Sequence, residues 1–103
     1  MTVEHTAGTA INDVSWQVNN GAGYIYCQKA TNGATPTECC APEGEHDVDC
    51  ADASGGWSGY RLYLSGVEVC SGFTSGTAKS DTWYLEGNMF NLCFLSTVLR
   101  CNE

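Results

Sequence analysis

Seven cysteines in a chain of 103 residues are the feature that most restricts the fold. This cysteine density in so short a chain is typical of proteins that fold in an oxidising compartment, where disulfides support a small hydrophobic core. Each disulfide contributes roughly 2–4 kcal/mol, so three of them are comparable to the net stability of a whole domain. We therefore expect a secreted, disulfide-braced protein. The candidate cysteines are Cys27, Cys39, Cys40, Cys50, Cys70, Cys93 and Cys101.

The cysteine count is odd, so the thiols cannot all pair within one chain. The sequence leaves open which cysteine is unpaired and how the others are connected. We expect a monomer with internal disulfides. The alternative is a disulfide-linked dimer formed through the odd cysteine, for which Cys101 near the end of the chain is a candidate.

Length and composition predict a single folded domain spanning residues 1–103. The chain is 43% hydrophobic and 16% charged, which is too apolar for a disordered chain. Its formal net charge is -8, with four Lys and Arg residues against twelve Asp and Glu residues. Such a surface is a poor partner for nucleic acids and anionic membranes, and no apolar run approaches the roughly 20 residues of a membrane span.

Alternating polar and apolar residues predict strands rather than helices along most of the chain. In the stretch 14–18, "VSWQV", the residues Val14, Trp16 and Val18 fall on one face. The turn "NNGAG" separates this stretch from "YIYCQK" at residues 24–29, which predicts a first β-hairpin. Trp16 is expected in the core, as is Trp83 further along the chain.

The segment 60–69 predicts a second hairpin together with its register. The stretches "YRLYL" and "VEV" are joined by Ser65-Gly66, and a two-residue loop fixes which residues lie opposite each other. The expected pairs are Leu64 with Val67, Leu62 with Val69 and Tyr63 with Glu68. The apolar pairs then share one face while Tyr63 faces outward, so register and hydrophobic pattern agree. Cys70 is expected on the polar face.

The segment 81–95, "DTWYLEGNMFNLCFL", suggests a third pair of strands that turns at residues 86–88. Residues 89–101 also fit a short helix, and short apolar runs do not separate these cases. Strands are favoured because aromatic and β-branched residues are frequent. The predicted fold is mainly β: a small disulfide-braced antiparallel β-sandwich or barrel of six or seven short strands. The alternative is an α+β fold with a short C-terminal helix.

Residues 31–56 are rich in Gly, Ala, Pro, Thr, Asp and Glu and poor in periodic apolar residues, which predicts a long acidic loop pinned by disulfides. Cys70 needs a partner from a segment that lies over the polar face of the second hairpin. We therefore expect one of Cys39, Cys40 or Cys50 to bond Cys70. The acidic residues of the loop are candidates for contacting a partner. They are Glu43, Glu45, Asp47, Asp49 and Asp52.

Neither a metal site nor a cofactor is expected in this loop. The adjacent Cys39 and Cys40 with a single His46 do not give the spaced, paired ligands of a zinc site. The carboxylates supply oxygen ligands that suit Ca2+, but Ala51 stands where an EF-hand loop has a ligand, and the turn glycine and terminal Glu are missing. A solvated acidic loop is the favoured interpretation.

No catalytic residues are assigned. His5 and His46 are the only histidines, and neither falls in a predicted strand. The chain is similar to small secreted fungal ribonucleases in size and composition, but those enzymes need a set of His, Glu, Arg and His on adjoining strands. In an oxidising compartment the default role of a cysteine is a structural disulfide rather than a nucleophile. The protein is therefore expected not to be an enzyme.

Cysteine-bearing blocks are spread along the whole chain: "YIYCQ", "ECCAPE", "VDCAD", "VEVCSG", "NLCFL" and "LRCNE". In this profile the chain resembles small secreted cysteine-rich proteins of filamentous fungi, of the effector or elicitor type. The resemblance implies binding to a host protein or a cell-wall glycan outside the producing cell. The first ten residues lack the basic and apolar regions of a secretory signal, so we expect a mature chain behind an added start Met.

Two kinds of partner follow from these residues. The acidic loop would recognise a basic extracellular or host protein, with an affinity that falls as salt is added. The alternative is glycan binding, in which Trp57, Tyr60 and Tyr63 of "GGWSGYRLYL" stack on sugar rings. Trp57 and Tyr60 are favoured as core residues, so only Tyr63 is expected to face outward.

Overall fold

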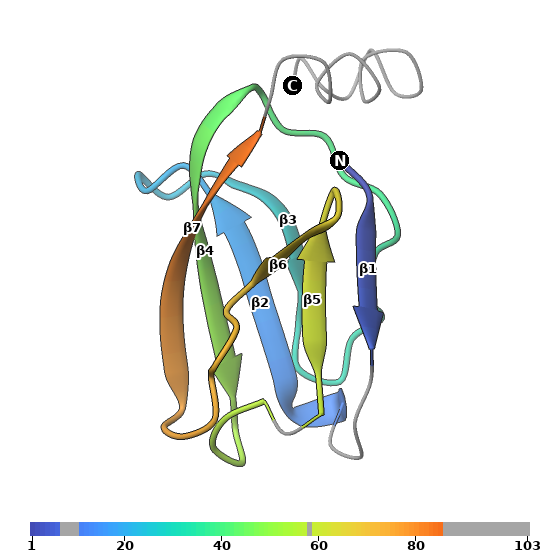
Figure 1. Cartoon of the computed structure of the whole chain (residues 1–103), viewed down its shortest axis with the longest axis vertical. Helices are drawn as coiled ribbons and strands as arrows, with labels where there is room; N and C mark the ends of the chain where they lie inside the picture. The colour runs from blue at the N-terminus through green and yellow to red at the C-terminus, as the bar shows by residue number, and fades with distance from the viewer. Residues whose placement is uncertain (7–10, 58, 86–103) are drawn as a thin grey trace.

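The computed structural model describes residues 1–6, 11–57 and 59–85, and in this part of the chain the regular structure is almost entirely β (Figure 1). The strands are β1 (Val3–Thr6), β2 (Val14–Asn19), β3 (Ile25–Lys29), β4 (Gly44–Asp52), β5 (Arg61–Leu64), β6 (Val67–Val69) and β7 (Ala78–Leu85). A 3-10 turn, Ile11–Asp13, precedes β2. No helix of the described residues is long and apolar enough to cross a membrane.

The strands form two antiparallel sheets that pack as a sandwich, which confirms the predicted fold class. One sheet has the order β1-β5-β6 and the other β3-β2-β4-β7. In Figure 1, β6 crosses in front of β2. Inward side chains of both sheets form one core that includes Trp16 and Trp83, as expected. Whether residues 89–101 form a strand or a helix is a question that lies outside the described residues.

Both predicted hairpins are present. β2 pairs with β3, and β5 pairs with β6 in the predicted register, with Leu62 opposite Val69 and Tyr63 opposite Glu68. Leu62 and Leu64 are fully buried, whereas Val67 remains 52% exposed because it directly follows the turn. The short loop and the alternation of apolar residues therefore were sufficient to fix this pairing.

The prediction of a loop throughout residues 31–56 is wrong for its second half. Residues 44–52 form β4, an inner strand that pairs with β2 on one side and β7 on the other. Its inward positions include His46, Val48 and Cys50, which are buried, while Asp47 and Asp49 face outward. The period-two alternation is therefore present, but two of the four buried residues of β4, His46 and Asp52, are polar.

Disulfides brace the described part of the chain. Cys50 bonds Cys70, so the predicted bond to Cys70 is confirmed, and Cys27 bonds Cys39. Cys40 is disulfide-bonded as well. The expected geometry of the first bond was wrong, however. Cys70 has a φ of 55° that ends the alternation of β6, so its buried side chain joins the two sheets through Cys50 instead of holding a loop over the polar face.

Candidate functional site

The five acidic candidates do not share one loop. Glu43 is exposed just before β4, and Asp52 is buried at its end, where its Oδ1 accepts a hydrogen bond from the Ser54 backbone N–H at 2.7 Å. Glu45, Asp47 and Asp49 occupy alternate outward positions of β4. Carboxylates at alternate strand positions are spaced by about 7 Å. We call the outward side of the β3-β2-β4-β7 sheet, with these three carboxylates, the acidic face.

Asp49 is held in place by neighbours on both adjoining strands. Its Oδ2 accepts hydrogen bonds from Asn19 Nδ2 at 2.9 Å and Gln17 Nε2 at 3.4 Å, and its Oδ1 accepts one from Ser80 Oγ at 3.0 Å. Burial acts to raise the pKa of Asp49, but the three hydrogen bonds outweigh it and leave the pKa below its usual range. Asp49 is therefore a fixed, ionised carboxylate at neutral pH.

A shallow hollow of about 310 Å³ lies beside Asp49 on the acidic face. It exists because three cross-strand neighbours, Ser15, Ala51 and Ala78, all have small side chains. This sheet contains two lysines, Lys29 and Lys79. Lys29 is buried, and Lys79 lies on the same side of β7 as the buried Trp83, so none of the outward positions on the four described strands is Lys or Arg. The acidic face therefore offers a negative charge next to a small, largely apolar depression.

Lys29 is buried, unlike the other described Lys and Arg residues. Its Nζ donates hydrogen bonds to the backbone oxygens of Val14 at 2.8 Å, Ile11 at 3.2 Å and Ala30 at 3.3 Å. Loss of water on burial lowers the pKa of Lys29. Lys29 thus ties β3 to the start of β2 and is unavailable to a partner.

The acidic residues do not converge on a cation in the described part of the chain. No group of three or more His, Cys, Asp or Glu side chains there is arranged to hold a metal ion. Alternation along β4 separates the buried Asp52 from the outward Asp47 and Asp49, whereas Ca2+ needs several oxygens around one point.

The three aromatic candidates have different environments. Trp57 and Tyr60 are buried in the core, as favoured from the sequence, and their rings meet edge to face with centroids 4.8 Å apart. Trp57 Nε1 donates to the backbone oxygen of Ala51 at 3.0 Å, and the Tyr60 hydroxyl accepts from Trp16 Nε1 at 3.1 Å. Tyr63 is partly exposed on the outward side of β5. The two buried rings therefore cannot serve as open stacking platforms for sugars.

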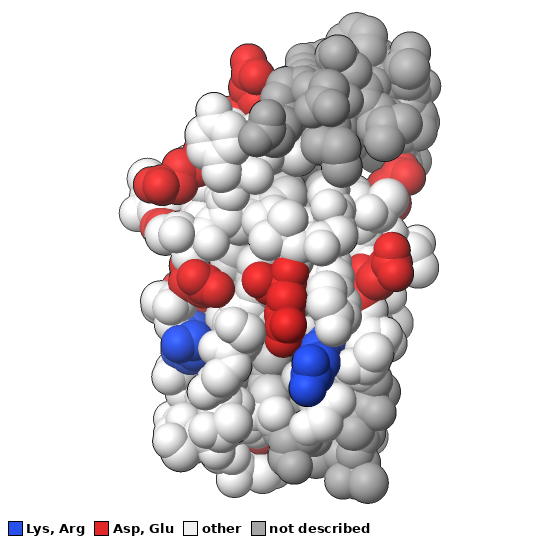
Figure 2. All heavy atoms as spheres, in the orientation of Figure 1, with Lys and Arg blue, Asp and Glu red and all other residues white. Residues whose placement is uncertain are grey.

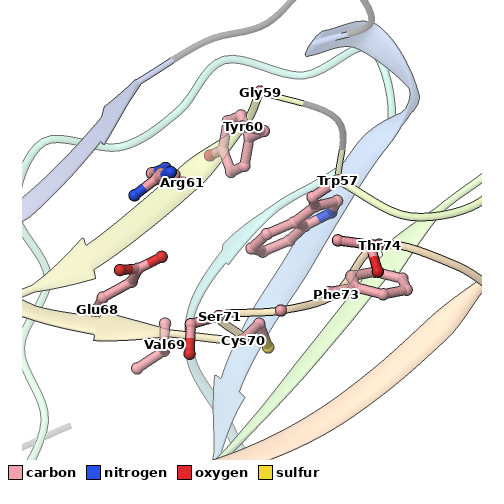
Figure 3. A pocket seen from close by; sticks show the side chains of 11 residues that line it. Trp57, Gly59, Tyr60, Arg61, Glu68, Val69, Cys70, Ser71, Phe73 and Thr74 are labelled. Carbon is pink, nitrogen blue, oxygen red and sulfur yellow. The ribbon is translucent and has the colours of Figure 1, made fainter.

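Trp57 and Tyr60 instead form part of the wall of a groove beside the second hairpin. This groove has a volume of about 520 Å³ and runs between the β5–β6 hairpin and the segment 70–74. Figure 3 shows Arg61 and Glu68 at one end and Trp57 and Phe73 at the other. The groove therefore has a charged end and an aromatic end.

Arg61 is distinctive on a surface with few accessible cations. Of the three described basic residues, Arg61 is exposed and Lys79 is half-buried, while Lys29 is buried. Basic atoms accordingly form two separate spots among more numerous acidic ones in Figure 2. An accessible guanidinium beside a carboxylate is thus a local feature of the groove.

Sequence reasoning did not assign Arg61, Glu68 or Phe73 to a binding site. The hairpin register contained the signal for the first two, because Glu68 lies opposite Tyr63 and therefore diagonally from Arg61 on the same face. Phe73 had no such signal. It reaches the groove only because the chain reverses after Cys70, where φ becomes positive.

The histidines lie in strands, which corrects the expectation that neither does. His5 is in β1 and His46 is in β4, so they belong to different sheets. The ring of His46 is buried between Tyr26 and Trp83, with centroid distances of 5.3 and 5.6 Å. His46 Nδ1 has no hydrogen-bond partner among the described residues. The ring of His5 lies against Tyr60. The two histidines therefore pack in separate aromatic clusters.

His46 is expected to make the fold sensitive to mild acid. Burial lowers the pKa of His46, and the backbone at Gly44 and Trp83 and the charge of Asp47 offset only part of this effect. The unfolded chain takes up a proton near pH 6.5 that the folded protein excludes, so the associated stability is present above that pH and is lost as the pH falls toward the folded pKa. His46→Phe should therefore flatten the dependence of the unfolding free energy on pH between about pH 7 and about pH 5.

Urea unfolding at a series of pH values measures this dependence. Tyr26→Phe keeps an aromatic ring against His46 and serves as the control, which should retain the pH dependence of the original protein. An unchanged dependence in His46→Phe would contradict the assignment.

Two surfaces of the described residues thus combine charge with a hollow: the acidic face and the groove beside the second hairpin. Comparison with known proteins finds no matching family model, no match among curated proteins and none among solved structures. Function therefore has to be inferred from the chemistry of these surfaces.

Proposed function

We propose that the protein is a secreted, non-catalytic binding protein of the effector or elicitor type, and that its acidic face recognises a basic segment of an extracellular or host protein. The observation that supports this most directly is the hollow beside Asp49. A fixed, ionised carboxylate adjoins a depression floored by Ser15, Ala51 and Ala78 on a face without Lys or Arg at the described outward positions. The disulfides of the described chain support secretion, because such bonds persist outside the reducing cytosol.

The shape and charge of this face suit a lysine or arginine side chain. The aliphatic stem would lie over Ala51 and Ala78, and the cationic head would reach Asp49. Hydrogen bonds that fix Asp49 before binding reduce the ordering cost of forming the ion pair. Glu45 and Asp47, at alternate positions of the same strand, add attraction for further basic residues of an extended partner.

A synthetic peptide with lysine at every second position, Lys-Thr-Lys-Thr-Lys, tests the proposal by isothermal titration. It should bind at low ionic strength and lose affinity between about 0.05 M and about 0.5 M NaCl, because salt screens exposed charges. Asp49→Asn should weaken binding by about tenfold, since a charge-assisted hydrogen bond is replaced by a neutral one. Glu45→Gln, at an exposed position of the same face, should weaken it less.

Glu4→Gln is the matched control because it removes the same charge from an exposed position of β1, which belongs to the other sheet. It should leave peptide affinity almost unchanged. Equal losses in Asp49→Asn and Glu4→Gln would mean that net charge alone attracts the peptide. That result, or an affinity independent of salt, would overturn the proposed role of the acidic face.

A further inference from the structure

We infer that the groove beside the second hairpin is a second binding site, for a short neutral oligosaccharide. It lies along the β1-β5-β6 sheet, whereas the acidic face belongs to the other sheet, so the inference does not depend on the proposed protein partner. Its volume of about 520 Å³ is within the range of small-molecule sites, roughly 300–1,000 Å³.

The charged end of the groove selects for a neutral ligand rich in hydroxyl groups. Arg61 supplies guanidinium donors and Glu68 supplies carboxylate acceptors at the same end (Figure 3). A cationic or an anionic ligand would meet one like charge there, whereas each hydroxyl of a sugar both donates and accepts. Ser71 and Thr74 add exposed hydroxyls along the groove.

The aromatic end offers carbon surface rather than polar atoms. Trp57 and Phe73 pack with ring centroids 5.7 Å apart, and both are almost fully buried, so only a small part of each side chain borders the groove. The indole N–H of Trp57 is already donated to Ala51. Sugar C–H groups can contact the accessible aromatic carbons while the hydroxyls face the charged end. This differs from the stacking on exposed rings that the sequence suggested.

The groove is built before any ligand arrives. The Trp57 backbone N–H donates to the Phe73 oxygen at 2.6 Å, which fixes the aromatic wall. Cys70 is anchored by its disulfide to Cys50 and by its backbone N–H, which donates to Asp81 Oδ2 at 2.8 Å. Little conformational freedom remains to be lost on binding, and preorganisation of this kind increases affinity.

Tyr63 can contact a longer glycan that extends beyond the groove. It is two residues after Arg61 on the same outward side of β5 and lies between Glu4 and Glu68 in the sheet. Its ring is partly exposed, so a sugar extending past Arg61 would meet an aromatic surface flanked by carboxylate acceptors. Tyr63 is thus the one predicted sugar-contacting residue that remains open to solvent.

NMR titration of the labelled protein with five neutral hexasaccharides tests the site: those of cellulose, chitin, β-1,3-glucan, xylan and mannan. At least one should shift backbone resonances of residues 59–61 and 68–74. Arg61→Ala should weaken binding of that sugar by about tenfold or more. Lys79→Ala removes the same charge outside the groove and should not change it. Affinity should be nearly equal at about 0.05 M and about 0.5 M NaCl, because the ligand is neutral.

Several outcomes would overturn the inference. They are a failure of all five sugars to shift these resonances, equal weakening by Lys79→Ala, and salt-dependent binding of an acidic oligogalacturonate in place of the neutral sugars. The two sites are also separable. Asp49→Asn should leave sugar binding intact and Arg61→Ala should leave lysine-peptide binding intact, so failure at one surface does not imply failure at the other.

Discussion

Replacing Cys50 and Cys70 together by alanine should lower the free energy of unfolding by about 3–5 kcal/mol. The bond joins positions 20 residues apart, and closure of such a loop in the unfolded chain accounts for about 3 kcal/mol. Both cysteines are almost fully buried and connect the inner face of β4 to the end of β6, so loss of the sulfurs also leaves space in the core. Urea unfolding followed by tryptophan fluorescence measures the change.

The Cys27–Cys39 bond provides a matched comparison. It joins positions 12 residues apart, so the chain-entropy contribution is similar, but Cys39 is only partly buried at the edge of the core. Replacing Cys27 and Cys39 together should therefore cost about 1–2 kcal/mol less than replacing the other pair. If replacing Cys27 and Cys39 lowers the free energy of unfolding by as much or more, the link between the two sheets does not add stability beyond that of an ordinary disulfide.

The parts of the fold that sequence predicted are those set by local pairing. The second hairpin is the clearest case, because two loop residues and alternating apolar positions placed Leu62 opposite Val69. The sequence could not order the strands in the sheets. That order depends on contacts between distant segments, such as the pairing of β1 with β5, which no local pattern records.

β4 was mistaken for a loop because burial and hydrophobicity do not coincide along it. Val48 is the only aliphatic residue among its inward positions, while His46, Cys50 and Asp52 are buried for specific reasons. His46 lies between two aromatic rings, Cys50 is in a disulfide, and Asp52 accepts a hydrogen bond from the following turn. The alternation of acidic residues in "EHDVD" was the available signal, since outward charges at every second position also indicate a strand.

For the candidate sites too, the sequence predicted the features that local pairing determines and missed those that depend on contacts between distant segments. The sequence named the acidic residues of β4, but their shared outward face followed only from the strand assignment. It also favoured Trp57 and Tyr60 as core residues, and the hairpin register predicted that Tyr63 faces outward. The groove itself could not be predicted, since it requires the segment 70–74 to fold back beside Trp57.

Gly56→Ala should destabilise the protein by about 2–5 kcal/mol and distort the groove. Gly56 has a φ of 81°, and a Cβ there would lie 2.6 Å from the Thr74 carbonyl carbon and 2.8 Å from the Ser75 backbone nitrogen. Because both are backbone atoms, no side-chain rotation relieves the overlap. The segment 73–75 would have to move away from Trp57, which breaks the contact that fixes the aromatic wall.

Gly76→Ala separates the steric effect from the effect of the backbone angle. Gly76 has a nearly identical φ of 79°, but nothing lies within 4 Å of a Cβ at that position. It should therefore cost only about 1–2 kcal/mol, the strain of a left-handed alanine. Urea unfolding gives both values, and near-ultraviolet circular dichroism should change in Gly56→Ala alone, because only that variant displaces Phe73 from Trp57. Equal losses in the two variants would show that the close approach of Gly56 to Thr74 does not hold the groove together.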